Sequence, residues 1–339
     1  MNEKVTIYDI AKKLNITAAT VSRALNNNPK ISESTRKLVM ETAAAMNYKQ
    51  NKLAVALKSG KSNTVGVIVP YIDRNFFASI IRGIEEELDP MGYHTIICQT
   101  HEDEQKEKDT INALLNTQID GILMSITKVT QSTSHFRNVL NKQIPLIFFD
   151  RKKNIPGVST VTINDFDGGY QATKHLIEQG CKRIAHTSGD FALEIYKDRF
   201  EGYKEALSEY GIPFKKEYVM QTRSDTDAGK DAITKFMKLP NPPDALFSSS
   251  DYVALGAIQK LKELGVNIPE DFSVVGFSNE PFTKFMELSI SSVDQNPMEM
   301  GKMAARVFLE QMNDSGVKIE KKVILSPSLM IRKSSTKND

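Results

Sequence analysis

The sequence predicts two unlike parts, a small all-α head and an α/β body made of two similar parallel-sheet subdomains. Two observations support this fold class. Residues 6–46 carry apolar side chains at the three- and four-residue spacing of amphipathic helices. After residue 63, continuous apolar strands alternate with helices, and the series restarts near residue 158. Such alternation indicates parallel sheets that are covered by helices on both faces.

The first two helices of the head are expected on either side of a tight turn at Asn15. Asn tolerates the left-handed conformation that such a turn needs. Thr6 and Thr17 can cap the two helices, because a threonine hydroxyl can satisfy a free backbone N–H. The inner faces are expected to comprise Ile10, Ala11 and Leu14 in the first helix, and Val21 and Leu25 in the second.

A third helix is expected to begin after its N-cap, Ser32, in the stretch ISESTRKLVMETAAAMNY. Its inner face would comprise Leu38, Val39, Thr42, Ala43 and Met46. A short candidate helix at residues 51–57 follows, within a basic run. An isolated helix of this length is marginal in water, so we expect it to form when two copies pack together.

The outer face of the second helix is small, polar or cationic, since it carries Ala18, Ala19, Ser22 and Arg23. A slim helix of this kind suits the DNA major groove, which is about 12 Å wide. The first 62 residues hold 11 Lys or Arg against 4 Asp or Glu, whereas the other 277 residues hold 33 against 38. This asymmetry predicts a basic head that binds a polyanion. For the helix pattern alone, an ordinary helical hairpin is the alternative.

Three blocks of the head resemble the lactose/galactose repressor family of bacterial transcription regulators. They are Val5–Asn26 with YDIAKKLNIT and TVSRALN, then Ser32 with Thr35-Arg36, and Asn47-Tyr48 with Asn51, Ala54 and Leu57. The resemblance implies a helix-turn-helix head (1–50), a hinge helix and linker (51–62) and a periplasmic-binding-protein-like body. It also implies a homodimer on a palindromic DNA operator, and the short polar tail RKSSTKND favours a dimer over a tetramer.

The resemblance and the helix pattern together give the expected DNA-binding residues. Arg23 would contact a guanine edge in the major groove. Leu57 would enter the minor groove as an apolar wedge, with a plain flexible tether as the alternative. The full set is Thr6, Tyr8, Thr17, Ala18, Ala19, Thr20, Ser22, Arg23, Asn26, Tyr48, Asn51, Ala54 and Leu57.

The body is expected to consist of two strand–helix series. The strands are expected at 64–70, 94–100, 120–126 and 144–150, and then at 158–165, 182–188, 244–250 and 272–278. A further helix and a last strand are expected within 293–312 and 321–335. The family resemblance implies three crossings between subdomains, near Thr160–Thr162, Ser291–Val293 and Ile324–Ser326. The subdomains would then comprise 63–161 plus 293–323, and 162–292 plus 324–334.

A small-molecule effector is expected in the cleft between the subdomains, because ligands of open parallel sheets bind beyond the carboxyl ends of the strands. Polar residues follow several strands, and Phe76 follows the first, where its ring could stack on a flat ligand. The resemblance adds Arg199, which lies in a matching R-x-x-G-Y stretch. The expected effector-binding residues are Phe76, Phe77, Asp150, Arg151, Arg199, Ser250, Asp251 and Ser278, and the expected effector is a sugar or sugar derivative.

Two departures from the family pattern bear on the effector. Ser250-Asp251 stands where many sugar-binding members have Asn-Asp, and Ser278-Asn279 stands where many have Asp-Asn. The loss of a carboxylate removes a strong acceptor for sugar hydroxyls. It would also leave Arg199 less opposed, which favours a phosphorylated or carboxylated ligand. The departures keep open an alternative in which a partner protein controls the regulator.

Other function classes find little support in the sequence. It offers no nucleophile–base pair, phosphate loop or metal-ligand spacing, so we expect no enzyme, cofactor or metal. A sugar-handling enzyme stays a weaker alternative, because fold alone does not exclude it. Cys98 and Cys181 are isolated and are expected to be free thiols. The absence of a long apolar run and of a signal sequence predicts a cytoplasmic protein without a membrane span.

Overall fold

A computed structural model describes residues 5–49, 61–313 and 320–337. The chain forms two units, Met1–Ser62 and Asn63–Asp339, which we call the head and the body. The expected hinge residues Asn51, Ala54 and Leu57 lie outside the described residues.

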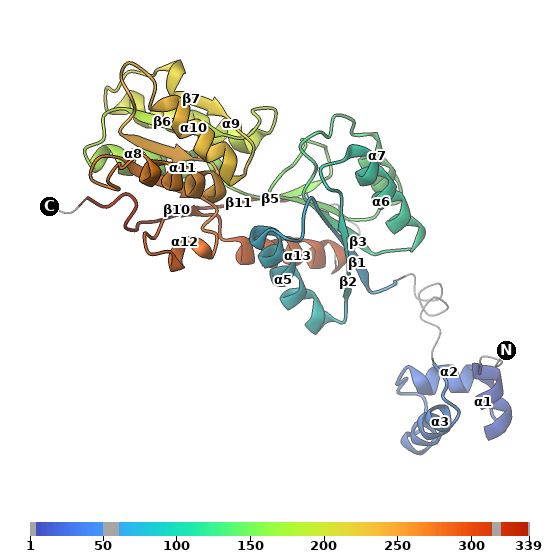
Figure 1. Cartoon of the computed structure of the whole chain (residues 1–339). Helices are drawn as coiled ribbons and strands as arrows, with labels where there is room; N and C mark the ends of the chain where they lie inside the picture. Colours follow the sequence, from blue (N-terminus) through green and yellow to red (C-terminus); the bar gives the residue numbers. More distant parts are fainter. Residues whose placement is uncertain (1–4, 50–60, 314–319, 338–339) are drawn as a thin grey trace. The chain divides into compact units, whose positions relative to one another are not determined.

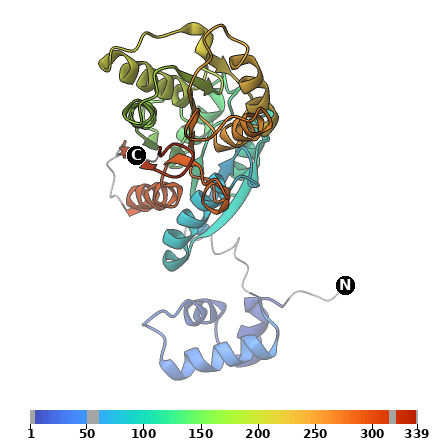
Figure 2. The same cartoon turned by 60° about the vertical axis from the view of Figure 1, so that its left-hand side comes forward.

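Residues 5–49 of the head form three helices, drawn in blue in Figures 1 and 2: α1 (Ile7–Leu14), α2 (Ala18–Leu25) and α3 (Glu33–Ala45). Asn15 ends α1 in the left-handed conformation, with φ of 52°. The Thr17 hydroxyl caps α2 by accepting a hydrogen bond from the Thr20 N–H at 3.1 Å. At the start of α1, the Asp9 carboxylate accepts hydrogen bonds from both the N–H and the hydroxyl of Thr6.

The core of the head corrects one expected inner-face residue. Leu38 is 51% exposed, whereas its neighbour Val39 is fully buried. The buried residues of α3 are Val39, Thr42 and Ala43, whose spacing of three and four places Leu38 one position off their face. They pack against Ile10, Ala11, Val21 and Ala24.

The first subdomain of the body contains a six-stranded sheet in the order β11-β5-β4-β3-β1-β2, in which all neighbours are parallel. Helices α5 and α13 cover one face, and α6 and α7 cover the other. The strands are β1 (Thr64–Val69), β2 (His94–Gln99), β3 (Gly121–Met124), β4 (Leu146–Phe149), β5 (Ser159–Ile163) and β11 (Lys322–Leu325). The helices are α5 (Asn75–Leu88), η1 (Asp89–Met91), α6 (Glu104–Asn116), α7 (Ser134–Asn141) and α13 (Pro297–Asn313).

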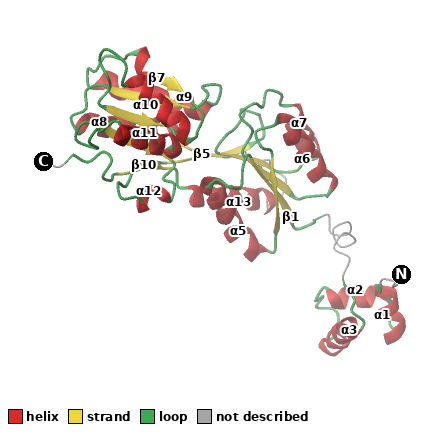
Figure 3. Cartoon of the chain, in the orientation of Figure 1, coloured by secondary structure: helices red, strands yellow, loops and turns green. Residues whose placement is uncertain are grey.

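The second subdomain repeats this design with a sheet in the order β12-β10-β9-β8-β6-β7, between α8 and α9 on one face and α10 and α11 on the other. Figure 3 shows both sheets in yellow between red helices. The strands are β6 (Ile184–Ser188), β7 (Val219–Gln221), β8 (Ala245–Ser248), β9 (Ser273–Phe277), β10 (Ser291–Asp294) and β12 (Ser328–Met330). The helices are α8 (Asp165–Glu178), α9 (Glu194–Glu209), η2 (Lys216–Tyr218), α10 (Thr226–Phe236), α11 (Asp251–Glu263) and α12 (Phe282–Phe285).

Two features of the second sheet differ from the sequence-based expectation. The last strand, β12, pairs with β10 in the antiparallel direction. Strand β7 and helix α10 were not expected, because β7 is three residues long and α10 carries charged residues among few large apolar ones. These elements complete the strand–helix alternation between β6 and β8.

The chain passes three times between the two sheets, a few residues later than expected. Strands β5, β10 and β11 stay hydrogen-bonded to their own sheets along their whole length, so the chain leaves those sheets after Ile163, Asp294 and Leu325. The boundaries expected after residues 161, 292 and 323 therefore fall inside these strands.

Glycines set the distance between the paired helices of the body. One pair of glycines lies at each crossing: Gly83 and Gly301 for α5 and α13, Gly169 and Gly202 for α8 and α9, and Gly229 and Gly256 for α10 and α11. A Cβ atom on Gly169 would overlap the carbonyl oxygen of Arg199. This close approach brings Arg199, on α9, to the amino-terminal half of α8.

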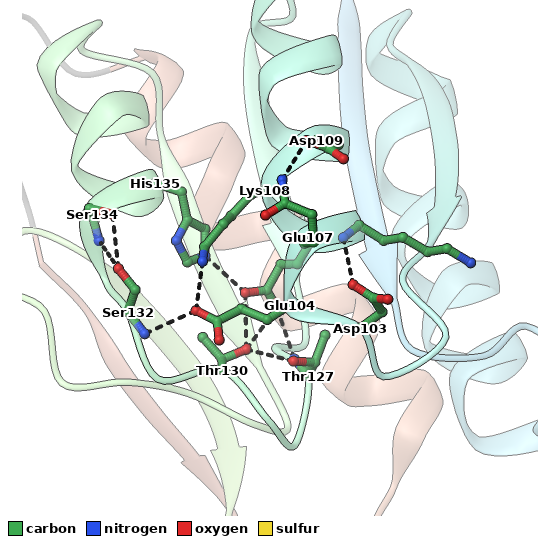
Figure 4. A network of polar contacts seen from close by, with 12 residues as sticks. Asp103, Glu104, Glu107, Lys108, Asp109, Thr127, Thr130, Ser132, Ser134 and His135 are labelled. Atoms are coloured by element: carbon green, nitrogen blue, oxygen red, sulfur yellow. Dashed lines mark hydrogen bonds and ion pairs between the residues drawn. The ribbon is translucent and has the colours of Figure 1, made fainter.

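A buried polar network joins α6, α7 and the loop after β3 (Figure 4). The Glu107 carboxylate is fully buried and accepts hydrogen bonds from the Thr127 N–H at 2.8 Å and the Thr130 hydroxyl at 3.0 Å. Its other contact is His135 Nε2 at 2.9 Å. Because a buried carboxylate is costly without such partners, the network fixes the path of this loop.

Candidate functional site

All eight expected effector-binding residues line one cavity of about 680 Å³ between the two subdomains of the body. Phe76, Phe77, Asp150 and Arg151 come from the first subdomain, and the other four come from the second. Most of them lie where a strand ends or a helix begins. Asp150 and Ser278 follow β4 and β9 directly and have positive φ angles of 59° and 114°. Such backbone strain is typical of functional sites.

Arg199 is buried and held on several sides. Its Nε donates to Asp165 Oδ1 at 2.7 Å, and its two Nη atoms donate to the Ser249 carbonyl and to Gln295 Oε1, each at 3.2 Å. Its guanidinium carbon lies 3.6 Å from the centre of the Phe277 ring. Because a guanidinium has five N–H groups, two remain for a ligand in the cavity.

The pair formed by Arg199 and Asp165 corrects the expectation that Arg199 is weakly opposed. Burial raises the pKa of Asp165 to about 6, even though the Arg199 charge acts against that rise. The Arg199 charge also acts on Asp150, where it opposes the rise in pKa that burial causes. An anionic ligand therefore gains less from Arg199 than the sequence suggested.

Asp150 and Arg151 form the floor of the cavity on the first subdomain. The Ser125 hydroxyl donates to Asp150 at 3.1 Å, and Arg151 donates to Glu102 at 2.8 Å. Burial raises the pKa of Asp150, and the Arg151 charge opposes this rise. The Arg151 Nε is buried and has no hydrogen-bond partner among the described residues.

Asp251 has a structural role in the cavity wall. It is 1% exposed, and its two carboxylate oxygens accept hydrogen bonds from the Ser292 hydroxyl at 2.7 Å and the Glu280 N–H at 2.8 Å. Burial raises its pKa to about 6. These contacts let Asp251 support the loop after β9, and the residue also lines the cavity, where its expected ligand contact stays a prediction. Ser250 precedes it as the N-cap of α11.

Phe76 and Phe77 are both core and cavity residues. Their rings meet edge to face, with centroids 5.1 Å apart, and both are nearly buried within the main core of the body. More exposed aromatic surface comes from tyrosines that the sequence analysis missed: Tyr71, Tyr196 and Tyr252. Arg74, from the first subdomain, stacks on Tyr252 of the second at 4.5 Å.

Two further polar residues of the cavity were also missed. Gln295 links Arg199 to Ser278, because its Nε2 donates to the Ser278 hydroxyl at 2.9 Å. It follows β10, so the strand-end rule applied to that strand would have found it. Glu280 lies two residues beyond Ser278 and is 5% exposed. An acidic residue three residues beyond the end of a strand is the feature of the sequence that indicates a place for Glu280 in the cavity.

Most of the expected DNA-binding residues of the head lie on α2 or at its ends, whereas Thr6 and Tyr8 lie at the start of α1 and Tyr48 follows α3. Thr6, Tyr8, Thr17, Ala19, Arg23 and Asn26 are exposed, and Ala18, Thr20, Ser22 and Tyr48 are partly buried. The Arg23 side chain makes no hydrogen bond or ion pair with the described residues of the head, 5–49. Ala18 packs in part against the core, so it offers less surface than Ala19.

The described residues lack two features that would point to other kinds of function. Residues 5–49, 61–313 and 320–337 contain no group of three or more His, Cys, Asp or Glu side chains that could hold a metal ion. Within these same ranges, no helix combines the length and apolar character needed to cross a membrane.

Comparison with known proteins identifies the family. Residues 6–51 match the model for bacterial regulatory proteins of the lacI family, and residues 62–332 match that for periplasmic binding proteins and the sugar-binding domain of the LacI family. The chain is 32% identical to the HTH-type transcriptional regulator DegA of Bacillus subtilis (strain 168), over 98% of each protein.

Two similar solved structures contain sugars. The transcriptional regulator CelR–cellobiose complex is 25% identical, with a TM-score of 0.73 over 97% of this chain and 99% of that chain. A LacI family regulator from Enterococcus faecium with bound ribose is 27% identical, with a TM-score of 0.73 over 80% of this chain and 98% of that chain. The helical head and the two parallel-sheet subdomains follow the same order as the two family models. The chain therefore belongs to the LacI, or lactose/galactose repressor, family of DNA-binding bacterial transcription regulators, which are not enzymes.

Proposed function

We propose that this regulator is a repressor whose affinity for operator DNA is set by a sugar or sugar derivative bound in the body cavity. The observation that carries the proposal is the chemistry of the cavity wall. Aromatic rings line it beside buried polar atoms that make no hydrogen bond with the described residues, among them the Ser249 hydroxyl and the Arg151 Nε. Sugars present apolar ring faces and hydroxyl groups, and both features find matching surfaces in such a wall.

The charge of the cavity favours an uncharged ligand over a sugar phosphate. Acidic and basic side chains are nearly balanced: Glu102, Asp150, Asp190, Asp225, Asp251 and Glu280 stand against Arg74, Lys128, Arg151, Arg199 and Arg223. The central cation, Arg199, is already paired with Asp165. The similar structures with cellobiose and ribose support an uncharged sugar as well.

The proposed DNA contacts belong to the head. Helix α2 would enter the major groove, with Arg23 reading a guanine and the exposed residues around it contacting bases or phosphates. A homodimer would place two heads on a palindromic site, and hinge residues Asn51, Ala54 and Leu57 would contact the minor groove. Because the regulator would act on bacterial DNA, we expect it to work in the cytoplasm.

The test combines ligand screening with DNA binding. The purified chain is heated with cellobiose, ribose or glucose 6-phosphate, since a ligand that binds the folded state raises the melting temperature. A duplex selected from a random library then reports operator affinity by fluorescence anisotropy. We expect a neutral sugar to raise the melting temperature and to change the operator Kd. If no sugar does either, while a captured partner protein changes the operator Kd, control by a protein is the correct function.

A further inference from the structure

Glu280 is held firmly by its backbone. Its N–H donates to the Asp251 carboxylate at 2.8 Å, and its carbonyl oxygen accepts hydrogen bonds from the N–H and the hydroxyl of Thr283 at 2.9 and 2.7 Å. The residue follows Ser278 and Asn279, which both have positive φ angles. The path of the chain at the end of β9 therefore fixes where the Glu280 side chain begins.

The Glu280 carboxylate, in contrast, has no such contact within the part of the chain that the structure describes. The residue is 5% exposed and lines the cavity, yet its carboxylate makes no hydrogen bond or ion pair with any described residue. The neighbouring Asp251 carboxylate is engaged by the Ser292 hydroxyl and the Glu280 N–H. The oxygens of Glu280, in contrast, are available to a ligand.

The nearest cation does not neutralise Glu280 by direct contact. Arg74 comes from the opposite subdomain and stacks on the Tyr252 ring at 4.5 Å, and it forms no ion pair with the described residues. The cavity therefore presents an unpaired acceptor next to an aromatic ring that is covered by a guanidinium. A ligand that supplies hydrogen-bond donors can satisfy the acceptor, whereas an anionic group cannot.

We propose that Glu280 is a specificity-determining residue that accepts hydrogen bonds from hydroxyl groups of the effector, and so selects an uncharged polyhydroxylated ligand over an anionic one. This inference rests on the proposed sugar-binding function. Hydrogen bonds to a charged acceptor are stronger than those between neutral groups. Removal of that charge is expected to weaken ligand binding by about 10- to 100-fold.

The experiment measures ligand Kd by calorimetry at pH 8, where the Glu280 carboxylate is ionised, for the wild-type chain and three variants. The probe is whichever of cellobiose, ribose and glucose 6-phosphate raises the wild-type melting temperature. Glu280→Gln removes the charge at nearly the same size, and Glu280→Asp keeps the charge but shortens the side chain. Glu270→Gln is the matched control, because Glu270 is exposed on the same subdomain and outside the cavity.

The proposal expects Glu280→Gln to raise the Kd for a neutral sugar by about 10-fold or more, Glu280→Asp to raise it less, and Glu270→Gln to leave it unchanged. A Kd for Glu280→Gln within about two-fold of wild type would overturn the role of Glu280 and leave the sugar-binding function standing. Tighter binding of glucose 6-phosphate by Glu280→Gln than by the wild type would support the selection against anions. No binding of any probe by the wild type would overturn the proposed function itself, and this inference with it.

Discussion

The unpaired carboxylate of Glu280 should make the empty regulator less stable at neutral pH than it would be without that charge. Burial, together with the nearby Asp251 charge, raises the pKa of Glu280 from 4.5 to about 7, and Arg74 opposes this rise. A raised pKa means that the folded chain binds the proton more tightly than the unfolded chain does. The contribution of Glu280 to the unfolding free energy is therefore fully present below pH 4.5, and it is lost as the pH rises through about 7.

The size of the effect follows from the same pKa values. A rise from 4.5 to about 7 corresponds to about 3 kcal/mol of unfolding free energy above pH 7. Glu280→Gln carries no titratable group, so it should escape this loss. The variant is expected to gain up to about 3 kcal/mol over the wild type at pH 8, which is several degrees in melting temperature. Near pH 4.5 the gain should approach zero.

The assay is thermal unfolding of the full chain without ligand, followed by circular dichroism between pH 5 and pH 8. Comparison of variants is needed because Asp165 and Asp251, whose pKa values are raised to about 6, titrate in the same range in every sample. Glu270→Gln serves again as the exposed control and should show no pH-dependent difference.

One result would refute this reasoning. If Glu280→Gln were no more stable than the wild type at pH 8, or if its advantage did not grow with pH, the Glu280 carboxylate would not be an unpaired buried charge. A stabilised variant that also binds sugar weakly would show that the site keeps a costly group for the sake of recognition.

Three further predictions concern other parts of the chain. Arg199→Ala should abolish the response of operator binding to the sugar, while the ligand-free variant still binds operator. It should also lower the unfolding free energy by about 3–5 kcal/mol, because Asp165 is left as an uncompensated buried charge, and adding Asp165→Asn should recover part of that loss. A sugar concentration at half-response equal to that of the wild type would contradict the cavity assignment. Glu107→Ala should lower the melting temperature by the equivalent of about 2–4 kcal/mol, since Thr127 and His135 lose their buried partner; a normal melting temperature would show that the network of Figure 4 contributes little. Arg23→Ala should relax base preference at one position of each half-site in a randomised operator library, a change worth about 1–3 kcal/mol of discrimination, and unchanged preference at every position would rule out its base contact.

The sequence predicted the fold well because two strong local signals agree. Helical spacing with caps at Thr17 and Ser32 defined the head, and buried strands such as 64–70 and 144–150 defined the sheets. What was missed depends on tertiary context. Strand β7 is too short and α10 too polar to stand out. The direction of β12 depends on its pairing with β10, which no local pattern reports.

The cavity shows the same limit at the level of single residues. Strand ends pointed to seven of the expected residues and the family resemblance to Arg199, and all eight line one cavity, because parallel strands share an edge. The partners of each side chain were beyond the sequence. Asp165, at the start of α8, reaches Arg199 only because α8 and α9 cross closely at Gly169 and Gly202. Asp251 lines the cavity as expected, but no local pattern reports that it also accepts hydrogen bonds from Ser292 and from the Glu280 N–H.

The contacts across the cavity indicate how a ligand there could act at a distance. Arg74 stacks on Tyr252, and Lys152 pairs with Glu194 at 2.7 Å, so each contact joins one subdomain to the other. Three chain segments, after Ile163, Asp294 and Leu325, join the two sheets. A sugar that touches Glu280 on one side and Arg151 on the other would bind best at one spacing. The change in operator affinity that a sugar can cause is limited by the difference between its affinities for the alternative spacings. A single contact that is made at only one spacing, such as that of Glu280, would contribute directly to this difference.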